Sequence, residues 1–386
     1  MIFGDLKMKF NSRRIIVIAI IFISAIYCVN CALAAQPSVE EMAAQMLMVG
    51  FRGTEADENS AIIKHIREGF VGNVVLFEKD MTLGAGKLRN IESPAQLKKL
   101  IKALKEANAS SIPLWVAIDQ EGGKVQRLRP DRGFEADFPS AQTLGQGDES
   151  RTLSVAGKIG QELSRMGIDM NFAPVADLNI NPDSPAIGRV ERSFGDDPKI
   201  VAKHILAYIE GMNKAGILPC LKHFPGHGSA KNDTHYGATD ITSTWKDYEL
   251  LPYREIINSN LVVAIMSSHV YHEALDPEYP ASLSYSTTTS MLREILGWKG
   301  LIITDDLNMR AITHKYDVEE TINLAINAGA DILIFSCNAP FTIYDPDFPQ
   351  KAHKTLVKLV HDGKISKERL YESWKRIIAI KTPVMQ

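Results

Sequence analysis

Eight short runs of apolar and β-branched residues recur along the chain, and helix-forming stretches separate most of them. Such runs are typical of strands buried on both faces, as in a parallel sheet covered by helices. Eight strand–helix units predict an α/β protein built as a single (β/α)8 barrel of TIM type, with some irregular strands, rather than an open doubly wound sheet. The predicted strands are residues 46–51, 72–77, 113–119, 170–178, 218–224, 262–270, 301–306 and 331–337.

Sequence patterns of helical period fill most of the intervals between these strands. No linker, low-complexity tract or second apolar centre interrupts them, and 386 residues with 45% apolar content suffice for one large core. The sequence therefore predicts one folded domain over residues 35–386. The predicted helices are residues 93–109, 151–167, 198–216, 247–259, 288–297 and 318–330, followed by two closing helices within 349–381.

Residues 1–34 have the composition of a secretory signal. A basic segment precedes an apolar run and a group of small residues, in which Ala32 and Ala34 are spaced for cleavage before Ala35. The apolar run is short for a membrane span, so we expect export with cleavage in preference to a retained anchor. Cys31 raises lipidation as an alternative, although the two residues before it fit a lipobox poorly. Membrane contact is expected only through this segment.

Charge and cysteine content exclude several classes of protein. Charged residues make up 23% of the chain and the formal net charge is −3, so no basic face of the nucleic-acid-binding type is predicted. Only Cys220 and Cys337 would remain after cleavage of the signal, and each lies in or at the end of an apolar run. We expect both to be buried free thiols, and the core rather than disulfides to stabilise the fold.

Polar side chains lie at the ends of five of the predicted strands. In a (β/α)8 barrel, the carboxyl ends of all strands meet at one rim, where active sites lie. A single polar residue there could simply cap the next helix, but five clusters at one rim predict a functional site. The five segments are residues 117–123, 175–185, 221–228, 266–270 and 303–306.

The stretch KHFPGHGSAKNDTHYG, residues 222–237, carries three histidines. His223 and His227 have the i, i+4 spacing of a zinc site. That spacing requires a helix, which the intervening Pro-Gly pair breaks, and no second set of ligands is found. The sequence therefore disfavours a metal site, and phosphate-binding motifs are also missing.

Two pairs of titratable residues supply candidates for proton transfer and nucleophilic attack. Asp233 and His235 are two residues apart, so both lie on one side of an extended segment. A carboxylate on one imidazole nitrogen fixes the tautomer and raises the basicity of the other; an Asx-turn beside a solvated histidine is the alternative. Asp305 and Asp306 follow a predicted strand, so one can cap the next helix while the other projects into the site.

Four motifs, in this order, resemble the β-N-acetylhexosaminidases of glycoside hydrolase family 3, of the NagZ type. The resemblance runs from about Ser38 to the closing helices. It implies a (β/α)8 barrel that removes β-linked N-acetylglucosamine, typically from peptidoglycan fragments, with retention of configuration and without cofactor or metal. The motifs are IDQEGGKVQRL from residue 118, IG..ERSFGDDP from 187, KHFPGHGSAKNDTHYG from 222 and ITDDLNM from 303.

The resemblance also implies roles for single residues. Asp305 matches the family's nucleophile, His235 its acid/base, and Asp233 the partner of that histidine. An imidazole in this role departs from the usual pair of carboxylates, yet it can protonate the leaving oxygen and later activate water near neutral pH. The positions that match sugar-binding residues are Asp119, Arg127, Arg192, Lys222 and His223.

Two departures from the family pattern leave questions open. Segment 187–195 is longer by two residues, which makes Arg189 a rival to Arg192 as a sugar ligand. The rim loop 78–94 is also longer and could reshape the leaving-group side. We expect His227 to hold the loop after Pro225 rather than to react.

The expected partner is a carbohydrate, the expected state a monomer, and the expected location periplasmic or secreted in a bacterium. The natural substrate, muropeptide or chitooligosaccharide, stays open. Two other functions also stay open: another family 3 activity such as β-glucosidase, and an exported sugar-binding barrel without catalysis.

Overall fold

The computed structural model describes residues 36–84, 86–135, 137–259 and 261–382. All the helices and strands reported below lie in one compact unit, Val39–Gln386. The predicted signal sequence, residues 1–34, lies outside the described residues. Among the described helices, none combines the length and the apolar character needed to cross a bilayer.

Within the described residues, eight parallel strands close into a barrel. Their order around the barrel is β1-β10-β9-β7-β5-β4-β3-β2, so each strand pairs with its neighbours in sequence and the last pairs with the first. The predicted (β/α)8 fold is confirmed, and each strand lies within a run predicted to be one. The strands are β1 (Leu47–Gly50), β2 (Asn73–Leu76), β3 (Trp115–Ile118), β4 (Met170–Asn171), β5 (Leu218–Phe224), β7 (Ala264–Ser267), β9 (Ile302–Asp306) and β10 (Ile332–Phe335). A separate pair joins β6 (Thr239–Asp240) to β8 (Val270–Tyr271).

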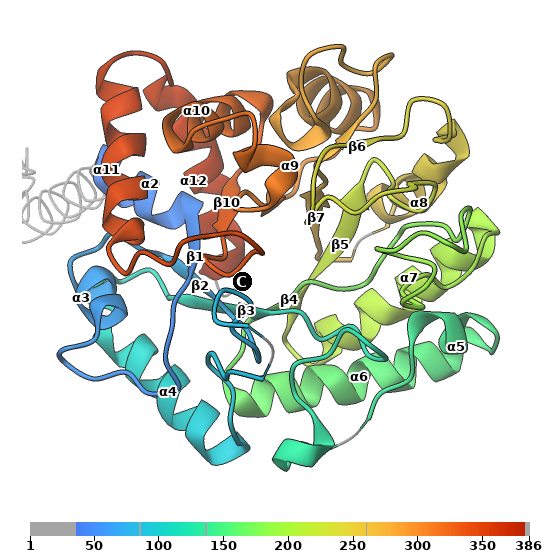
Figure 1. Cartoon of the computed structure of the whole chain (residues 1–386), viewed down its shortest axis with the longest axis horizontal. Helices are drawn as coiled ribbons and strands as arrows, with labels where there is room; N and C mark the ends of the chain where they lie inside the picture. Colours follow the sequence, from blue (N-terminus) through green and yellow to red (C-terminus); the bar gives the residue numbers. More distant parts are fainter. Residues whose placement is uncertain (1–35, 85, 136, 260, 383–386) are drawn as a thin grey trace, which may run out of the picture. The chain divides into compact units, whose positions relative to one another are not determined.

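Helices surround the barrel, as Figure 1 shows. Most begin at a side chain that accepts a hydrogen bond from the first turn. Ser93 caps α4 in this way, and Asp197 caps α7. The α-helices are α2 (Val39–Met46), α3 (Ala61–Arg67), α4 (Pro94–Ala107), α5 (Ala141–Gly145), α6 (Glu149–Met166), α7 (Pro198–Lys214), α8 (Leu251–Ile257), α9 (Arg310–Thr313), α10 (Val318–Ala328), α11 (Phe348–His361) and α12 (Lys367–Lys381). Short 3-10 helices are η1 (Pro130–Arg132), η2 (Asp247–Leu250) and η3 (Ala281–Leu283), and η4 (Ser286–Ile295) is a π-helix.

Both faces of the barrel strands are buried, which explains their continuous apolar sequences. In β3, Val116 and Ile118 belong to the apolar cluster that includes the inner face of α4. The alternate residues Trp115 and Ala117 belong to a second cluster together with Met266 and other strand residues, inside the barrel. Cys220 and Cys337 are buried free thiols, as predicted.

The strand predicted over residues 170–178 is much shorter than expected. Regular pairing stops at Asn171, because the chain then passes through Pro174, which has no N–H to donate. Pairing with β5 resumes irregularly: Lys222 N donates to the Pro174 carbonyl at 3.1 Å, and Ala176 N donates to the Lys222 carbonyl at 2.6 Å. The prediction that some strands are irregular is therefore confirmed.

Replacing Asp331 with alanine should lower the free energy of unfolding by about 3 kcal/mol, because it removes a buried carboxylate and leaves half-buried cations without their partner. The Asp331 carboxylate, fully buried at the start of β10, accepts hydrogen bonds from Arg293 at 2.6 Å and Arg376 at 3.0 Å. It also accepts the backbone N–H of Ile302 at 2.9 Å. Chemical denaturation would measure the loss. The control is Glu106→Ala on the surface of α4, expected to change stability by less than about 0.5 kcal/mol; equal effects would contradict the prediction.

Candidate active site

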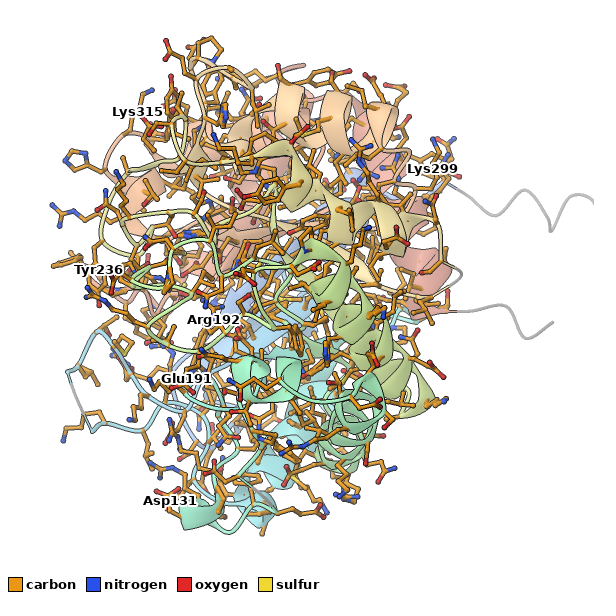
Figure 2. The ribbon with its side chains drawn as sticks, turned by 90° about the vertical axis from the view of Figure 1, so that its right-hand side faces the viewer. Asp131, Glu191, Arg192, Tyr236, Lys299 and Lys315 are labelled. Carbon is orange, nitrogen blue, oxygen red and sulfur yellow. The ribbon has the colours of Figure 1, made fainter. Side chains whose placement is uncertain are left out.

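One cavity at the carboxyl ends of the strands contains seven of the eight predicted site residues. Asp119 follows β3, Lys222 and His223 lie in β5, and Asp305 lies near the end of β9. In the side view of Figure 2, Tyr236, next to His235, lies at one edge of the molecule, and Lys299, which precedes β9, lies at the opposite edge. The predicted residues that line the cavity are Asp119, Arg127, Arg192, Lys222, His223, His235 and Asp305; apolar lining comes from Val75, Phe77, Val125, Phe172, Met266 and Ile334.

Asp305 presents an ionised carboxylate to this cavity. Burial alone would raise the pKa of Asp305, but neighbouring imidazoles, with His269 first among them, and the backbone N–H of Asp306 bring it below the ordinary value. That N–H donates to Asp305 Oδ1 at 2.8 Å. A carboxylate that stays ionised in an enclosed site can act as a nucleophile.

Asp306 has a different environment, although it also borders the cavity. Its Oδ1 accepts the backbone N–H of Ser336 at 2.9 Å, and its Oδ2 accepts the Ser336 hydroxyl at 2.5 Å. Burial raises the pKa of Asp306 to about 6. These contacts tie β9 to the segment after β10, which fits the supporting role expected for Asp306.

Asp233 and His235 are joined in the loop that follows β5. Asp233 Oδ1 lies 2.7 Å from His235 Nδ1 and accepts the backbone N–H of His235 at 2.9 Å. Burial opposes protonation of His235, but the hydrogen bond and charge of Asp233 outweigh it and raise the pKa of the imidazole. Burial likewise acts against ionisation of Asp233, yet His235 lowers its pKa to about 2. Because Nδ1 is held by Asp233, Nε2 is left for proton transfer.

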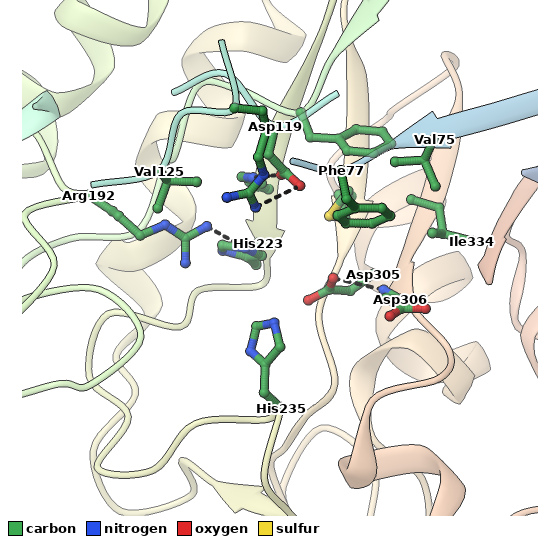
Figure 3. Close-up of a pocket in the computed structure, with 14 residues that line it drawn as sticks. Val75, Phe77, Asp119, Val125, Arg192, His223, His235, Asp305, Asp306 and Ile334 are labelled. Carbon is green, nitrogen blue, oxygen red and sulfur yellow. Dashed lines mark hydrogen bonds and ion pairs between the residues drawn. The ribbon is translucent and has the colours of Figure 1, made fainter. Parts of the chain in front are cut away.

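His235 and Asp305 face the same open space from two sides. Figure 3 shows the imidazole of His235 pointing into the centre of the cavity, onto which the Asp305 carboxylate also opens. A proton donor and a nucleophile therefore lie on either side of a volume that a sugar ring could occupy.

A dense ion network forms one wall of the cavity. Lys222 Nζ contacts Asp119 Oδ1 at 2.8 Å and Glu121 Oε1 at 2.6 Å. Arg192 donates two parallel hydrogen bonds to the same Glu121 carboxylate, at 2.9 and 2.8 Å. Burial disfavours the ionised forms, but the opposite charges lower the pKa of Asp119 and of Glu121 and raise that of Lys222. All these groups therefore stay charged and offer fixed donors and acceptors to hydroxyl groups.

The two candidate arginines of segment 187–195 are clearly separated in space. The Arg192 side chain is 13% exposed and lines the cavity, with Nη2 at 3.4 Å from His223 Nε2. Arg189 is 65% exposed and lies 3.8 Å from Asp183 on an outer surface. Arg127 also lines the cavity, with Nη2 at 3.5 Å from Asp119 Oδ2. Arg192, not Arg189, is therefore placed to contact a molecule in the cavity.

Asp177 holds the ring of His223 in β5 and the backbone of His227 in the loop that follows. Its Oδ2 lies 2.6 Å from His223 Nδ1, and its Oδ1 accepts the backbone N–H of His227 at 2.7 Å. Burial lowers the pKa of His227 to about 4, so this imidazole is neutral, and its Nε2 lies 3.5 Å from the Thr234 hydroxyl. These contacts fit the expected role of His227 in holding the loop.

Glu121, Asp177 and His269 belong to the site but were not singled out from the sequence. Each lies in one of the five polar segments that follow predicted strands, so the signal was present. Their partners lie far away in sequence: Glu121 binds Arg192, and His269 Nε2 donates to the Asp306 carbonyl at 2.9 Å. Among the described residues, no group of three or more His, Cys, Asp or Glu side chains is arranged to hold a metal ion.

Comparison with protein families and solved structures gives consistent matches. The family model of the glycosyl hydrolase family 3 N-terminal domain matches residues 38–380. Beta-hexosaminidase A of Pseudoalteromonas piscicida is 33% identical over 338 residues, which cover 82% of this chain and 54% of that protein. Beta-hexosaminidase of Nitrosomonas eutropha is 35% identical over 304 residues, covering 76% and 81%.

A solved structure resembles the whole barrel. The glycoside hydrolase family 3 beta-N-acetylglucosaminidase from Paenibacillus sp. str. FPU-7 superposes with a TM-score of 0.79 at 35% identity. The match covers 89% of this chain and 62% of that one. The chain thus spans about half the length of the Pseudoalteromonas protein and less than two thirds of the Paenibacillus protein.

Proposed function

The chain belongs to glycosyl hydrolase family 3, and we propose that it is a retaining exo-β-N-acetylglucosaminidase. The observation that carries the proposal is the Asp305 carboxylate opening onto the same cavity as the joined Asp233–His235 pair. The names of its relatives, β-hexosaminidases and a β-N-acetylglucosaminidase, support the choice of sugar.

In the first step, Asp305 attacks the anomeric carbon of the terminal sugar. The carboxylate oxygen forms a bond to that carbon as the bond to the glycosidic oxygen breaks. Protonated His235 gives its Nε2 proton to the departing oxygen, so the leaving sugar departs as a neutral alcohol. The products are a covalent glycosyl-Asp305 and a neutral imidazole.

In the second step, water releases the sugar. Neutral His235 takes a proton from the water as its oxygen attacks the anomeric carbon and displaces the Asp305 carboxylate. Two displacements on opposite faces restore the β configuration. Asp233 keeps the imidazole in one orientation throughout and stabilises its charged form.

The sugar is held by the charged side chains that line the cavity. Carboxylate oxygens of Asp119 accept hydrogen bonds from hydroxyl groups, while the arginine and lysine donors bind hydroxyl and acetamido oxygens. His223 Nδ1 is engaged by Asp177, so its Nε2 faces the sugar. Besides Asp119, the side chains in this set are Arg127, Arg192, Lys222 and His223.

Peptidoglycan fragments are the proposed substrate, and the space outside the cytoplasm of a bacterium is the proposed location. The family motifs of the chain support the first, and the signal-like composition of residues 1–34 supports the second. The proposed oligomeric state is a monomer.

Two aryl glycosides, assayed side by side, test the activity. We expect hydrolysis of aryl β-N-acetylglucosaminide to exceed that of aryl β-glucoside, and NMR of the first-formed sugar to show the β anomer. A preference for the glucoside would favour a β-glucosidase, and no turnover of either would favour a binding protein without catalysis. An α anomer as first product would overturn the two-step mechanism.

In the Asp233→Asn variant, the alkaline limb of the pH profile of kcat/KM should move to lower pH than in the unchanged enzyme. The first step needs ionised Asp305, whose pKa is lowered, and protonated His235, whose pKa is raised above the ordinary 6.5. Thus kcat/KM falls on the acid side as Asp305 gains a proton and on the alkaline side as His235 loses one. Removing the charge of Asp233 lets His235 lose its proton sooner, so only the alkaline limb moves. A pH profile of kcat/KM measures this; movement of the acid limb alone would contradict it.

A further inference from the structure

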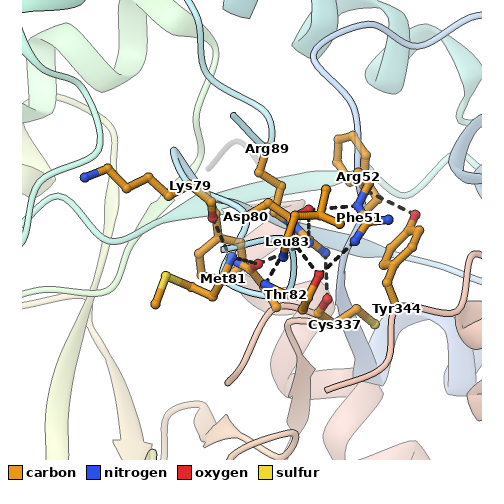
Figure 4. A network of polar contacts seen from close by, with 12 residues as sticks. Phe51, Arg52, Lys79, Asp80, Met81, Thr82, Leu83, Arg89, Cys337 and Tyr344 are labelled. Carbon is orange, nitrogen blue, oxygen red and sulfur yellow. Dashed lines mark hydrogen bonds and ion pairs between the residues drawn. The ribbon is translucent and has the colours of Figure 1, made fainter. Parts of the chain in front are cut away.

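Buried carboxyl groups outside the catalytic cavity differ in how completely they are hydrogen-bonded. Asp80, in the loop after β2, uses one oxygen to accept from Arg52 Nε at 2.8 Å and Arg89 Nη1 at 3.0 Å, as Figure 4 shows. Its other oxygen accepts backbone N–H groups of its own loop. Glu249, beside the loop that carries His235, uses only one oxygen within the described residues. The fold alone therefore leaves one oxygen of Glu249 without a role.

Glu249 packs against the first glycine of the catalytic loop, residues 225–237. It belongs to η2 and is 1% exposed. Its Oε1 accepts the backbone N–H of Lys246 at 3.0 Å, which fixes the orientation of the carboxyl group. The other oxygen, Oε2, lies so close to Gly226 that a β-carbon added there would be 2.7 Å away. Glu249 thus lies at the base of the catalytic loop and does not line the catalytic cavity.

The hydroxyl of Ser229, three residues after Gly226, is the matching group. Ser229 is 2% exposed, and within the described residues its hydroxyl has no hydrogen-bond partner. Burial raises the pKa of Glu249 to about 8, and the Ser229 hydroxyl acts in the opposite direction, as a nearby donor does. At neutral pH the carboxyl group is therefore protonated. Because Oε1 accepts a hydrogen bond, the proton belongs on Oε2, from which it can be donated to the Ser229 oxygen.

Backbone contacts hold the same part of the catalytic loop. Trp245 Nε1 donates to the Pro225 carbonyl at 3.1 Å. Asn181 donates to the two backbone carbonyls on either side of Ser229, at 3.1 and 2.9 Å. These contacts fix the backbone but do not engage the hydroxyl. The Ser229 side chain is therefore held near Glu249 through its backbone alone.

We propose that Glu249 is a positioning residue for the reaction: in the working position of the catalytic loop its carboxyl O–H donates to the Ser229 hydroxyl, and this contact places His235 at the glycosidic oxygen. The inference rests on the proposed function, in which His235 is the acid. Two buried polar groups left unpaired cost free energy, so a shift of the loop that joins them is favoured. Asp305 belongs to β9 and stays in place. Loss of the contact should therefore weaken protonation of the leaving oxygen more than nucleophilic attack.

The test compares two substrates in variants of Glu249. The leaving sugar of N,N′-diacetylchitobiose needs a proton, whereas the leaving group of dinitrophenyl β-N-acetylglucosaminide does not. In Glu249→Ala we expect kcat/KM to fall roughly 30-fold for the disaccharide and less than about threefold for the dinitrophenyl glycoside. Glu249→Gln keeps the shape and offers an N–H donor in place of the O–H. It should return hydrolysis of the disaccharide to within about threefold of the unchanged enzyme.

Ser229→Ala tests the other partner of the contact and removes only a hydroxyl group. We expect the same selective loss on the disaccharide. In the double variant of Glu249→Ala and Ser229→Ala the two losses should not add, because both changes remove one and the same contact.

Asp331→Ala is the matched control for stability. It removes another fully buried carboxyl group, just before β10 and thus at the end of the barrel away from the cavity. It should lower the free energy of unfolding but leave the ratio of the two rates unchanged. An unchanged ratio in Glu249→Ala, no recovery in Glu249→Gln, or additive losses in the double variant would overturn the inference while the proposed function stands. Failure of the unchanged enzyme to hydrolyse either substrate would overturn both.

Discussion

Asp305→Ala should lower kcat/KM for an aryl β-N-acetylglucosaminide by about 10⁴-fold or more, because no glycosyl-enzyme can form without the carboxylate. Initial rates at equal protein concentration measure the loss. The cavity wall formed by Asp119, Lys222 and Arg192 is untouched by this change. Binding of N-acetylglucosamine, measured by calorimetry, should therefore survive in the variant.

Azide can test whether the lost group was the nucleophile. In Asp305→Ala, a small anion can enter the vacated space, attack the anomeric carbon and give the α-glycosyl azide. Asp306→Asn serves as the matched control, because Asp306 binds Ser336 and is assigned a supporting role; it should retain measurable activity and form no azide. A normal rate in Asp305→Ala, or a β-configured azide, would show that Asp305 is not the nucleophile.

His235→Ala should lower activity by an amount that depends on the leaving group. A disaccharide has a poor leaving group that needs a proton, so the loss should reach about 10²- to 10⁴-fold. A dinitrophenyl glycoside leaves readily without a proton, so kcat/KM, which reports the first step, should change little. The ratio of the two losses, measured on one preparation, isolates the role of the acid.

Thr234→Ala controls for a general disturbance of the catalytic loop. Thr234 lies beside His235, and its hydroxyl contacts His227 rather than the cavity. If removing this hydroxyl merely loosens the loop, kcat/KM for the disaccharide and for the dinitrophenyl glycoside should fall by similar factors. An equal loss on both substrates in His235→Ala would mean that His235 is not the acid, and another residue at the rim would have to supply the proton.

Much of the fold could be predicted because local signals agree with the barrel. Runs of β-branched residues bounded by turns located all eight strands, and α4 begins after the Ser93 that starts its predicted pattern. The seven-residue α3 was missed, because so short a helix shows little periodicity. The chain beyond Asn171 was predicted to continue as strand to residue 178, since the pattern could not show how Pro174 would disturb its pairing with β5.

The site could be predicted in part for a similar reason. Strand ends that carry carboxylates or histidines indicated the segments that contain Asp305 and His223, because barrel topology brings such ends together. The resemblance to the family then chose these two residues. The pairing of Glu121 with Arg192 joins residues on different loops and depends on where each loop turns. Sequence patterns do not record such contacts, so the choice between Arg189 and Arg192 needed the three-dimensional structure.

The two contacts of Asp177 have a thermodynamic consequence. One oxygen holds the ring of His223, a wall of the sugar site, and the other holds the backbone at His227, where the loop carrying His235 begins. A sugar that shifts His223 can therefore act on the base of that loop through this carboxylate. Such coupling is reciprocal: if a bound sugar favours the working position of the loop, that position favours the sugar by the same free energy. Affinity for the terminal sugar and readiness to donate a proton would then rise and fall together.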